Sequence, residues 1–167
     1  PLAGEFRVNT YTTGHQSLPS AAVSLSGSFV VVWRSADGSA YGVLGQRFAV
    51  SGVPLGPEFR VNTYTAQAQT PTGVATDAVG NFVVVWQSSN QDGSLTGIFG
   101  QRYAASGAPL GPEFRVNSYT TSNQFGPAVA SDLLGNFVVV WTSQGQDGSA
   151  FGIFGQRYAS SGVPAGP

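Results

Sequence analysis

The sequence predicts an all-β protein that consists of three copies of one unit. The pentapeptide EFRVN occurs three times, beginning at Glu5, Glu58 and Glu113. No segment shows the 3.6-residue periodicity of an amphipathic helix, and the 23 Gly and 10 Pro leave little room for long helices. One repeat domain is therefore expected over residues 1–167, with units at approximately 5–57, 58–112 and 113–167.

Each unit is predicted to contain four short strands, which are clearest in the second unit. They lie near residues 74–76 and over residues 81–88, 97–104 and 113–120. The link Asp77-Ala-Val-Gly80-Asn81 suits a tight hairpin, because Asp can accept hydrogen bonds from backbone N–H groups and Gly can take a positive φ. Gly-containing turns also follow the second and third strands. Strands joined by such short links form an antiparallel sheet.

The second strand, FVVVW at residues 82–86, is apolar on both faces. An antiparallel sheet that is buried on both sides needs other sheets as its covering layers. Four-stranded sheets that recur about every 50 residues and pack against one another are the blades of a β-propeller. We therefore predict propeller-like blades, with a β-trefoil or β-prism of threefold internal symmetry as the alternative. The recurring tryptophans are expected to be structural: Trp33, Trp86 and Trp141.

The fourth strand is amphipathic. Glu113, Arg115 and Asn117 share one face, while Phe114 and Val116 share the other, as expected for a partly wet outer strand. Because an EFRVN segment opens the sequence, the last unit is expected to lack an outer strand of its own. The first segment could then complete a blade of another chain, which predicts a homo-oligomer or a filament formed by strand exchange.

PTGVATDAVGNFVVVW, residues 71–86, resembles the opening of an NHL-type propeller blade, in which V-A-x-D-x-x-G-N precedes an apolar strand. It is less closely similar to the Asp-box hairpin of sialidase-like propellers. The whole unit resembles tandem repeats of large bacterial surface and secreted proteins. The first unit departs from the pattern, with Ser24 and Ser28 in place of the Asp and Asn. The resemblance implies a fold and an extracellular setting, and it implies no activity.

Composition excludes several kinds of partner. Charged residues make up 9% of the chain, none of them is Lys, and the formal net charge is -1, which argues against a nucleic-acid partner. No apolar run approaches the roughly 20 residues of a membrane helix, so no membrane insertion is expected. The absence of Cys and Met fits an extracellular or cell-surface protein that is exposed to oxidants.

One arginine per unit lies in mid-strand between apolar neighbours: Arg47, Arg102 and Arg157. Such a side chain needs an acid or a carbonyl as its partner. We expect that partner to be the aspartate of the DGS turn, at Asp37, Asp92 or Asp147.

The same DGS turns are the candidate calcium site, since Asp, Asn and Ser oxygens suit that ion. Each turn offers one carboxylate where strong calcium loops offer several. A structural turn is therefore favoured, and no cofactor is expected.

Catalytic motifs are missing from the sequence. The single histidine, His15, lies in a loop that differs from the other units, and there is no nucleophile elbow, phosphate loop or H-E-x-x-H motif. The chain is therefore expected not to be an enzyme. Its predicted role is that of an extracellular structural module for a surface, matrix or filament.

The alternative function is that of a multivalent lectin. Sugar-binding sites use aromatic rings and amide side chains, and each unit carries a Tyr with a Gln five residues later. The candidate ligand-binding residues are Tyr11, Tyr64 and Tyr119 with Gln16, Gln69 and Gln124. Three weak sites on one chain would bind glycans with avidity.

Overall fold

A computed structural model describes residues 4–36 and 40–166 and confirms the all-β fold class. It contains three four-stranded antiparallel sheets, and within each sheet consecutive strands are neighbours. The first sheet comprises β1 (Gln16–Val23), β2 (Phe29–Ala36), β3 (Tyr41–Phe48) and β4 (Phe59–Arg60). The second comprises β5 (Gln69–Thr76), β6 (Phe82–Ser89), β7 (Thr96–Tyr103) and β8 (Phe114–Arg115). The third comprises β9 (Gln124–Ser131), β10 (Phe137–Gln144), β11 (Phe151–Tyr158) and β12 (Pro164–Ala165).

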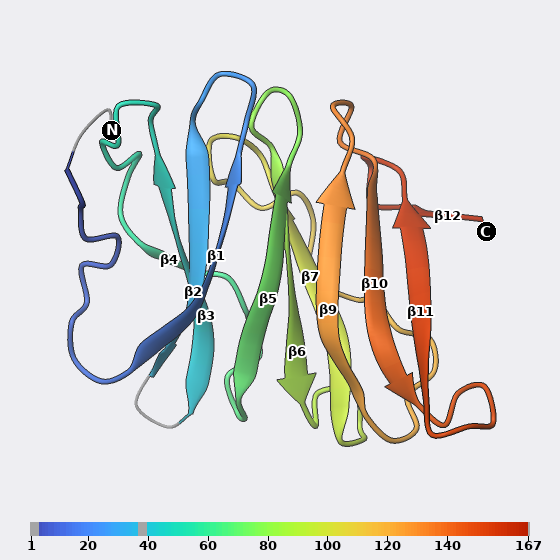
Figure 1. Cartoon of the computed structure of the whole chain (residues 1–167). Helices are drawn as coiled ribbons and strands as arrows, with labels where there is room; N and C mark the ends of the chain where they lie inside the picture. Colours follow the sequence, from blue (N-terminus) through green and yellow to red (C-terminus); the bar gives the residue numbers. More distant parts are fainter. Residues whose placement is uncertain (1–3, 37–39, 167) are drawn as a thin grey trace.

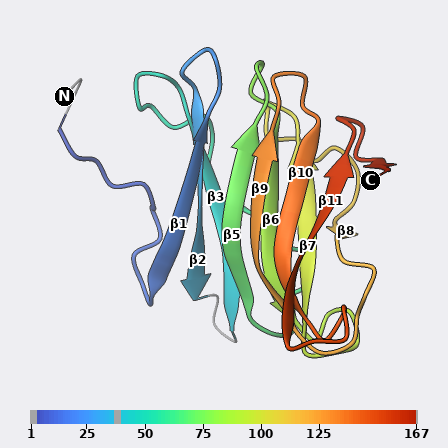
Figure 2. The same cartoon turned by 45° about the vertical axis from the view of Figure 1, so that its right-hand side comes forward.

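The sheets stack side by side in chain order, and we refer to them as the first, second and third blades (Figure 1). The first strands of the blades, β1, β5 and β9, lie next to one another along the stack (Figure 2). Among the described residues there is no helix long and apolar enough to cross a membrane.

The apolar strands are buried because each blade packs on the next. Val30 and Val32 of β2 share one core with Val84 and Trp86 of β6, which face the first blade. The opposite face of β6, including Val85, shares a second core with the third blade. Both faces of the middle blade are thus covered by sheets, which confirms propeller-like blades rather than a trefoil or prism. All three tryptophans are buried, with exposed fractions of 6% or less.

The Asp-x-x-Gly-Asn links form the predicted hairpins. The Asp77 carboxylate accepts hydrogen bonds from the backbone N–H groups of Val79 and Asn81 at 3.0 and 2.9 Å, and Gly80 has a φ of 93°. The Asn81 side chain donates to the other carboxylate oxygen at 2.7 Å. The hairpin of the third blade repeats this pattern. In the first blade, hydroxyl groups of Ser24 and its neighbours bond to one another in place of the carboxylate.

The first and fourth strands differ from the predicted bounds. β5 begins at Gln69, five residues before the predicted start, and β8 is two residues long instead of eight. The reason for the short β8 is Asn117. Its side-chain oxygen accepts the N–H of Ile98 at 2.6 Å and so replaces the next backbone carbonyl of the strand. The backbone is then free to leave the sheet.

The last strand of the third blade, β12, is not the equivalent of β4 and β8. It corresponds to the bridges of Pro54 with Phe48 and of Pro109 with Tyr103 in the other two blades. It pairs with Arg157 and Tyr158 near the end of β11. In the first blade β4 pairs with Leu44 and Gly45, in the middle of β3. Among the described residues, the middle of β11 therefore carries no strand equivalent to β4, as expected from the sequence.

Aromatic rings stack at one end of each blade. Phe137 and Tyr158 have ring centroids 4.7 Å apart and planes 10° from parallel, and Phe114 packs against both. Burial raises the pKa of the Tyr158 phenol to about 12. The pKa of Tyr103 is also raised, first by burial and then by the negative charge of Glu113.

These pKa values predict the alkaline behaviour of the protein. A phenol whose pKa lies above the unfolded value of about 10 stabilises the fold fully below that pH. Its contribution is lost as the pH rises from about 10 toward 12. We expect absorbance titration of the six tyrosines to show two that ionise late, and Tyr158→Phe to remove one of them. Ionisation of Tyr103 and Tyr158 near pH 10 would contradict this packing.

Candidate functional site

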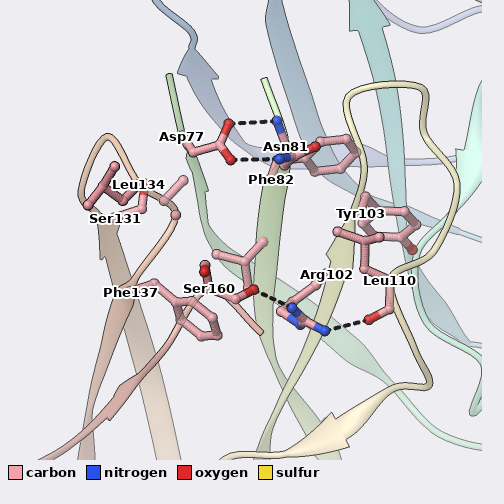
Figure 3. Close-up of a pocket in the computed structure, with 13 residues that line it drawn as sticks. Asp77, Asn81, Phe82, Arg102, Tyr103, Leu110, Ser131, Leu134, Phe137 and Ser160 are labelled. Atoms are coloured by element: carbon pink, nitrogen blue, oxygen red, sulfur yellow. Dashed lines mark hydrogen bonds between the residues drawn. The ribbon is translucent and has the colours of Figure 1, made fainter. Parts of the chain in front are cut away.

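A cavity of about 230 Å³ lies between the second and third blades, at the end that carries the Asp-x-x-Gly-Asn hairpins (Figure 3). The second blade contributes Asp77, Asn81, Arg102 and Tyr103 to its wall. The third blade contributes Ser131, Leu134, Phe137 and Ser160. The equivalent gap between the first and second blades measures only about 20 Å³. This cavity is therefore particular to one junction, although its residues occupy repeat positions.

Arg102 forms the cationic side of the cavity. Its guanidinium donates hydrogen bonds to the carbonyl oxygens of Leu110 and, in the neighbouring blade, Ser160 (Figure 3). Partial burial lowers its pKa from the usual value, but a guanidinium remains protonated at neutral pH. Its polar contacts link two blades and give the cavity a fixed positive group.

The aspartate partner predicted for these arginines is wrong for Arg102 and Arg157, which donate to carbonyl groups, while Asp37 of the first unit lies outside the described residues. Arg47 donates to the carbonyl oxygens of Ala105 and Leu55 at 2.6 and 2.7 Å, and Arg157 donates to that of Gly166. Asp92 precedes β7 whereas Arg102 lies near its end. Six residues of extended strand place these two groups about 20 Å apart.

Asp77 and Asn81 form the facing polar wall (Figure 3). Asp77 is 8% exposed, and its carboxylate accepts three hydrogen bonds from its own hairpin. The Asn81 side-chain oxygen accepts the N–H of Ala105 at 3.0 Å, which fixes the orientation of the amide. Hydrogen bonds within the protein fix the orientation of both groups, and carboxylate and amide oxygens can each accept a further bond.

Aromatic rings and a leucine complete the cavity. Phe82 and Phe137 line it from either blade, and Leu134 stands at its edge with 78% of its surface exposed. A small cavity with apolar rings, hydroxyl groups, an amide and one arginine suits a neutral molecule that is rich in hydroxyl groups. Sequence reasoning assigned Asp77 and Asn81 to a turn only. The apolar Leu133-Leu134 pair in the equivalent turn of the third unit, residues 132–136, was the available signal.

The predicted tyrosine sites lie at the opposite end of the blades. Tyr11 is 51% exposed, whereas Tyr64 and Tyr119 are half-buried in loops that lead into β5 and β9. Of the three paired glutamines, Gln69 and Gln124 are fully buried. These two amides have no surface open to a ligand, so their predicted ligand-binding role is corrected to a structural one.

The buried glutamines hold the tyrosine loops in place. Asn62 donates to the carbonyl of Tyr64 at 2.7 Å and to the side-chain oxygen of Gln69 at 3.0 Å. Asn117 makes the same contacts in the next unit. In the first unit Gln16 is half-buried and donates to the Thr13 carbonyl at 2.9 Å.

The candidate calcium residues cap their own turns. Asp92 and Asp147 each accept the backbone N–H of the serine two residues later at 3.1 Å. Asp37 lies outside the described residues. Within residues 4–36 and 40–166, no group of three or more His, Asp or Glu side chains is arranged to hold a metal ion. His15 is exposed in its loop.

No family model and no curated protein sequence matches the chain. Solved structures do share its fold. An endo-arabinase from Bacteroides thetaiotaomicron aligns with 96% of this chain and 64% of its own length, with 16% identity and a TM-score of 0.58. A Hadza microbial sialidase aligns with 89% of this chain and 36% of its own length, with 11% identity and a TM-score of 0.61. The chain thus spans less than two thirds of either protein.

These neighbours correct two expectations. The chain was expected to be a non-enzymatic structural module, yet the solved proteins that share its blades are an endo-arabinase and a sialidase. The expectation of no enzyme is overturned with it, because both of those names denote enzymes that act on carbohydrates. At these identities the likeness establishes the propeller-like fold alone. The chain is thus a set of three propeller-like blades of the kind that such proteins contain.

Proposed function

We propose that the chain is a carbohydrate-binding protein and that it binds a neutral sugar unit in the cavity between its second and third blades. The observation that carries this proposal is the cavity itself. Fixed polar groups from Asp77, Asn81 and Arg102 face the hydroxyl-bearing third blade, and aromatic rings line the cavity between them.

The size of the cavity sets the size of the ligand. At about 230 Å³ it lies below the roughly 300–1,000 Å³ of pockets for drug-sized ligands. It suits one sugar unit, for instance the terminal unit of a glycan. The names of the structural neighbours, an arabinase and a sialidase, support carbohydrate as the ligand class. They also provide the first probe, arabinan oligosaccharides, whose sugar units are neutral.

Filling the cavity tests the proposal. Leu134→Trp places a large ring at the edge of the cavity, and the 78% exposure of Leu134 leaves room for it without unfolding. We expect calorimetric titration with the best-binding oligosaccharide to show at least about a tenfold loss of affinity, which equals about 1.4 kcal/mol.

Leu133→Trp is the matched control. Leu133 is the preceding residue of the same hairpin, is 62% exposed and does not line the cavity. It should bind like the wild type. Equal affinities of the two variants would refute a site in this cavity.

The tyrosine loops are the competing location. Tyr64→Ala should leave sugar affinity unchanged if the cavity is the site. Binding that is lost in Tyr64→Ala and kept in Leu134→Trp, with both variants folded, would move the site to the tyrosine end of the blades.

A further inference from the structure

The two junctions between blades repeat the same contact of a ring over a glycine. A Cβ on Gly45 would lie 2.8 Å from the ring of Phe59, and one on Gly100 would lie 2.7 Å from the ring of Phe114. Each ring also packs against two aromatic residues of the following blade. The glycine is therefore needed for the outer strand to seat its Phe between two blades.

A second contact recurs beside the first. The N–H of Val43 donates to the Asn62 side chain at 2.7 Å, and that of Ile98 donates to Asn117 at 2.6 Å. The side chains of Val43 and Ile98 are fully buried in the cores of their junctions. Each junction thus pairs an apolar side chain on the third strand of one blade with an asparagine at the start of the next tyrosine loop.

The third blade presents the same contact residues to solvent. Ile153 is 76% exposed, although its equivalent Ile98 is fully buried. Val140 is 39% exposed, although its equivalent Val85 is fully buried. A Cβ on Gly155 would meet only atoms of its own blade, from Val139 and Val140. We call Val140, Ile153 and Gly155 the tail face. These residues are of the same types as those that form the internal junctions. No described residue covers the tail face in the way that Phe114 covers the second blade.

The first blade presents the complementary half of a junction, which we call the head face. The segment 5–9, EFRVN, lies against it, and Phe6 packs on Phe29 and Phe48 while remaining 54% exposed. Beside it is a cavity of about 200 Å³. The lining residues of this cavity include Val8, Asn9, Gln16, Val31 and Trp33. The equivalent residues of the second blade lie around the side chain of Val43, in the core between the first and second blades.

We propose that the tail face of one chain docks on the head face of a second copy and forms a third junction of the same kind. Ile153 then fills the head cavity, and its N–H donates to the Asn9 side chain. Phe6 of the second copy lies over Gly155, and its segment pairs with the middle of β11. No described residue pairs at this position. β12 pairs farther along β11, at Arg157 and Tyr158, where the other blades carry the bridges of Pro54 and Pro109.

A polar contact supports the same direction of docking. At the internal junctions the glutamate of each EFRVN segment accepts the N–H of the threonine in the preceding segment. Thr63 donates to Glu113 at 2.8 Å, and Thr10 donates to Glu58. Glu5 on the head face and Ser118 beside the tail face are both exposed and hold the corresponding positions.

Two copies suit the geometry of the stack. Propellers close with about four to eight blades, and two chains of three blades give six. Both junctions of such a ring are head-to-tail, which a twofold axis permits when each chain supplies one head and one tail. We therefore expect sedimentation analysis at high micromolar concentration to give twice the chain mass of 17.2 kDa. A single-chain mass at every concentration would overturn the proposal.

Substitutions on each face test the contact. Ile153→Asp and Phe6→Asp should each give single chains that retain wild-type circular dichroism, since both residues are exposed. Val163→Asp is the matched control on the third blade. Val163 is 61% exposed. Its equivalent in the first blade, Val53, is 59% exposed even though the second blade packs on the first, so docking should not bury this position. This control should remain paired.

Mixing the two defective variants distinguishes head-to-tail docking from two tail faces that pair with each other. The Ile153→Asp chain keeps an intact head, and the Phe6→Asp chain keeps an intact tail. Their mixture should form a species of two chains. A Phe6→Asp chain that pairs with itself, or a mixture that stays as single chains, would overturn the proposal.

A gain of association provides a further check. The hydroxyl groups of Thr76 and Ser131 donate across the internal junctions to Val23 and Thr76 carbonyls at 2.9 and 2.6 Å. Val23 on the head face lacks this hydroxyl. Val23→Thr should therefore lower the dissociation constant of the pair, and an unchanged or higher constant would contradict the predicted register.

Discussion

Asn117→Ala is expected to lower the free energy of unfolding by about 3 kcal/mol or more. Asn117 is 1% exposed and holds one loop to one strand. Its side-chain oxygen accepts the N–H of Ile98, and its nitrogen donates to the Tyr119 carbonyl at 2.9 Å and to Gln124 at 3.2 Å. Alanine leaves these buried groups without partners, and each such group costs about 1–3 kcal/mol.

Asn9→Ala is the matched control, because Asn9 is the same repeat residue on the head face. It donates to the Tyr11 carbonyl at 2.7 Å and lies in a more exposed part of the chain. Urea unfolding at low protein concentration should show a loss of about 1 kcal/mol or less for Asn9→Ala. Equal losses of unfolding free energy in the two variants would show that the contacts of Asn117 at the junction between blades do not cause the larger loss.

Gly100→Ala is expected to cost about 1–3 kcal/mol of unfolding free energy. A Cβ at this position would lie 2.7–3.2 Å from three carbon atoms of the Phe114 ring. The ring has little freedom to retreat, because it packs against Phe137 and Tyr158 with centroids 6.4 and 5.5 Å away. The methyl group must therefore displace the outer strand or separate the two blades.

Gly155→Ala separates this clash from the general effect of a glycine in a strand. In the single chain, the nearest neighbours of a new Cβ are Val140 Cγ1 at 3.2 Å and the Val139 oxygen at 3.4 Å. Thermal unfolding in dilute solution should show a loss of under about 1 kcal/mol. A Gly100→Ala variant as stable as Gly155→Ala would contradict the ring-over-glycine contact.

Local patterns predicted most of the fold, because the features that encode it lie close together in the sequence. The Asp-x-x-Gly-Asn turn sets a hairpin through bonds within five residues, and the doubly apolar FVVVW strand is buried by sheets on both faces. The length of β8 was not predictable in this way. It depends on a side chain, that of Asn117, which replaces a backbone carbonyl in a ladder with a distant strand.

The candidate site was predicted less well, because it forms between units. Arg102 was recognised as a cation in need of a partner, but its acceptors are carbonyl groups of Leu110 and Ser160. Carbonyl groups occur in every residue and leave no pattern in the sequence. The tyrosine and glutamine pairs showed a regular spacing, yet Gln69 and Gln124 serve the interior. A recurring polar residue thus indicated loop structure more reliably than binding.

The most direct measurement of sugar binding in the cavity is a nuclear magnetic resonance titration that follows the Arg102 Nε–H and the Asn81 side-chain amide. Both groups line the cavity, and both report on a ligand within it. On addition of arabinan oligosaccharides, we predict saturable shifts of these two signals, with the Tyr64 and Tyr119 loops unchanged. Saturable shifts confined to the tyrosine loops, or no shifts with any oligosaccharide, would contradict the proposed function.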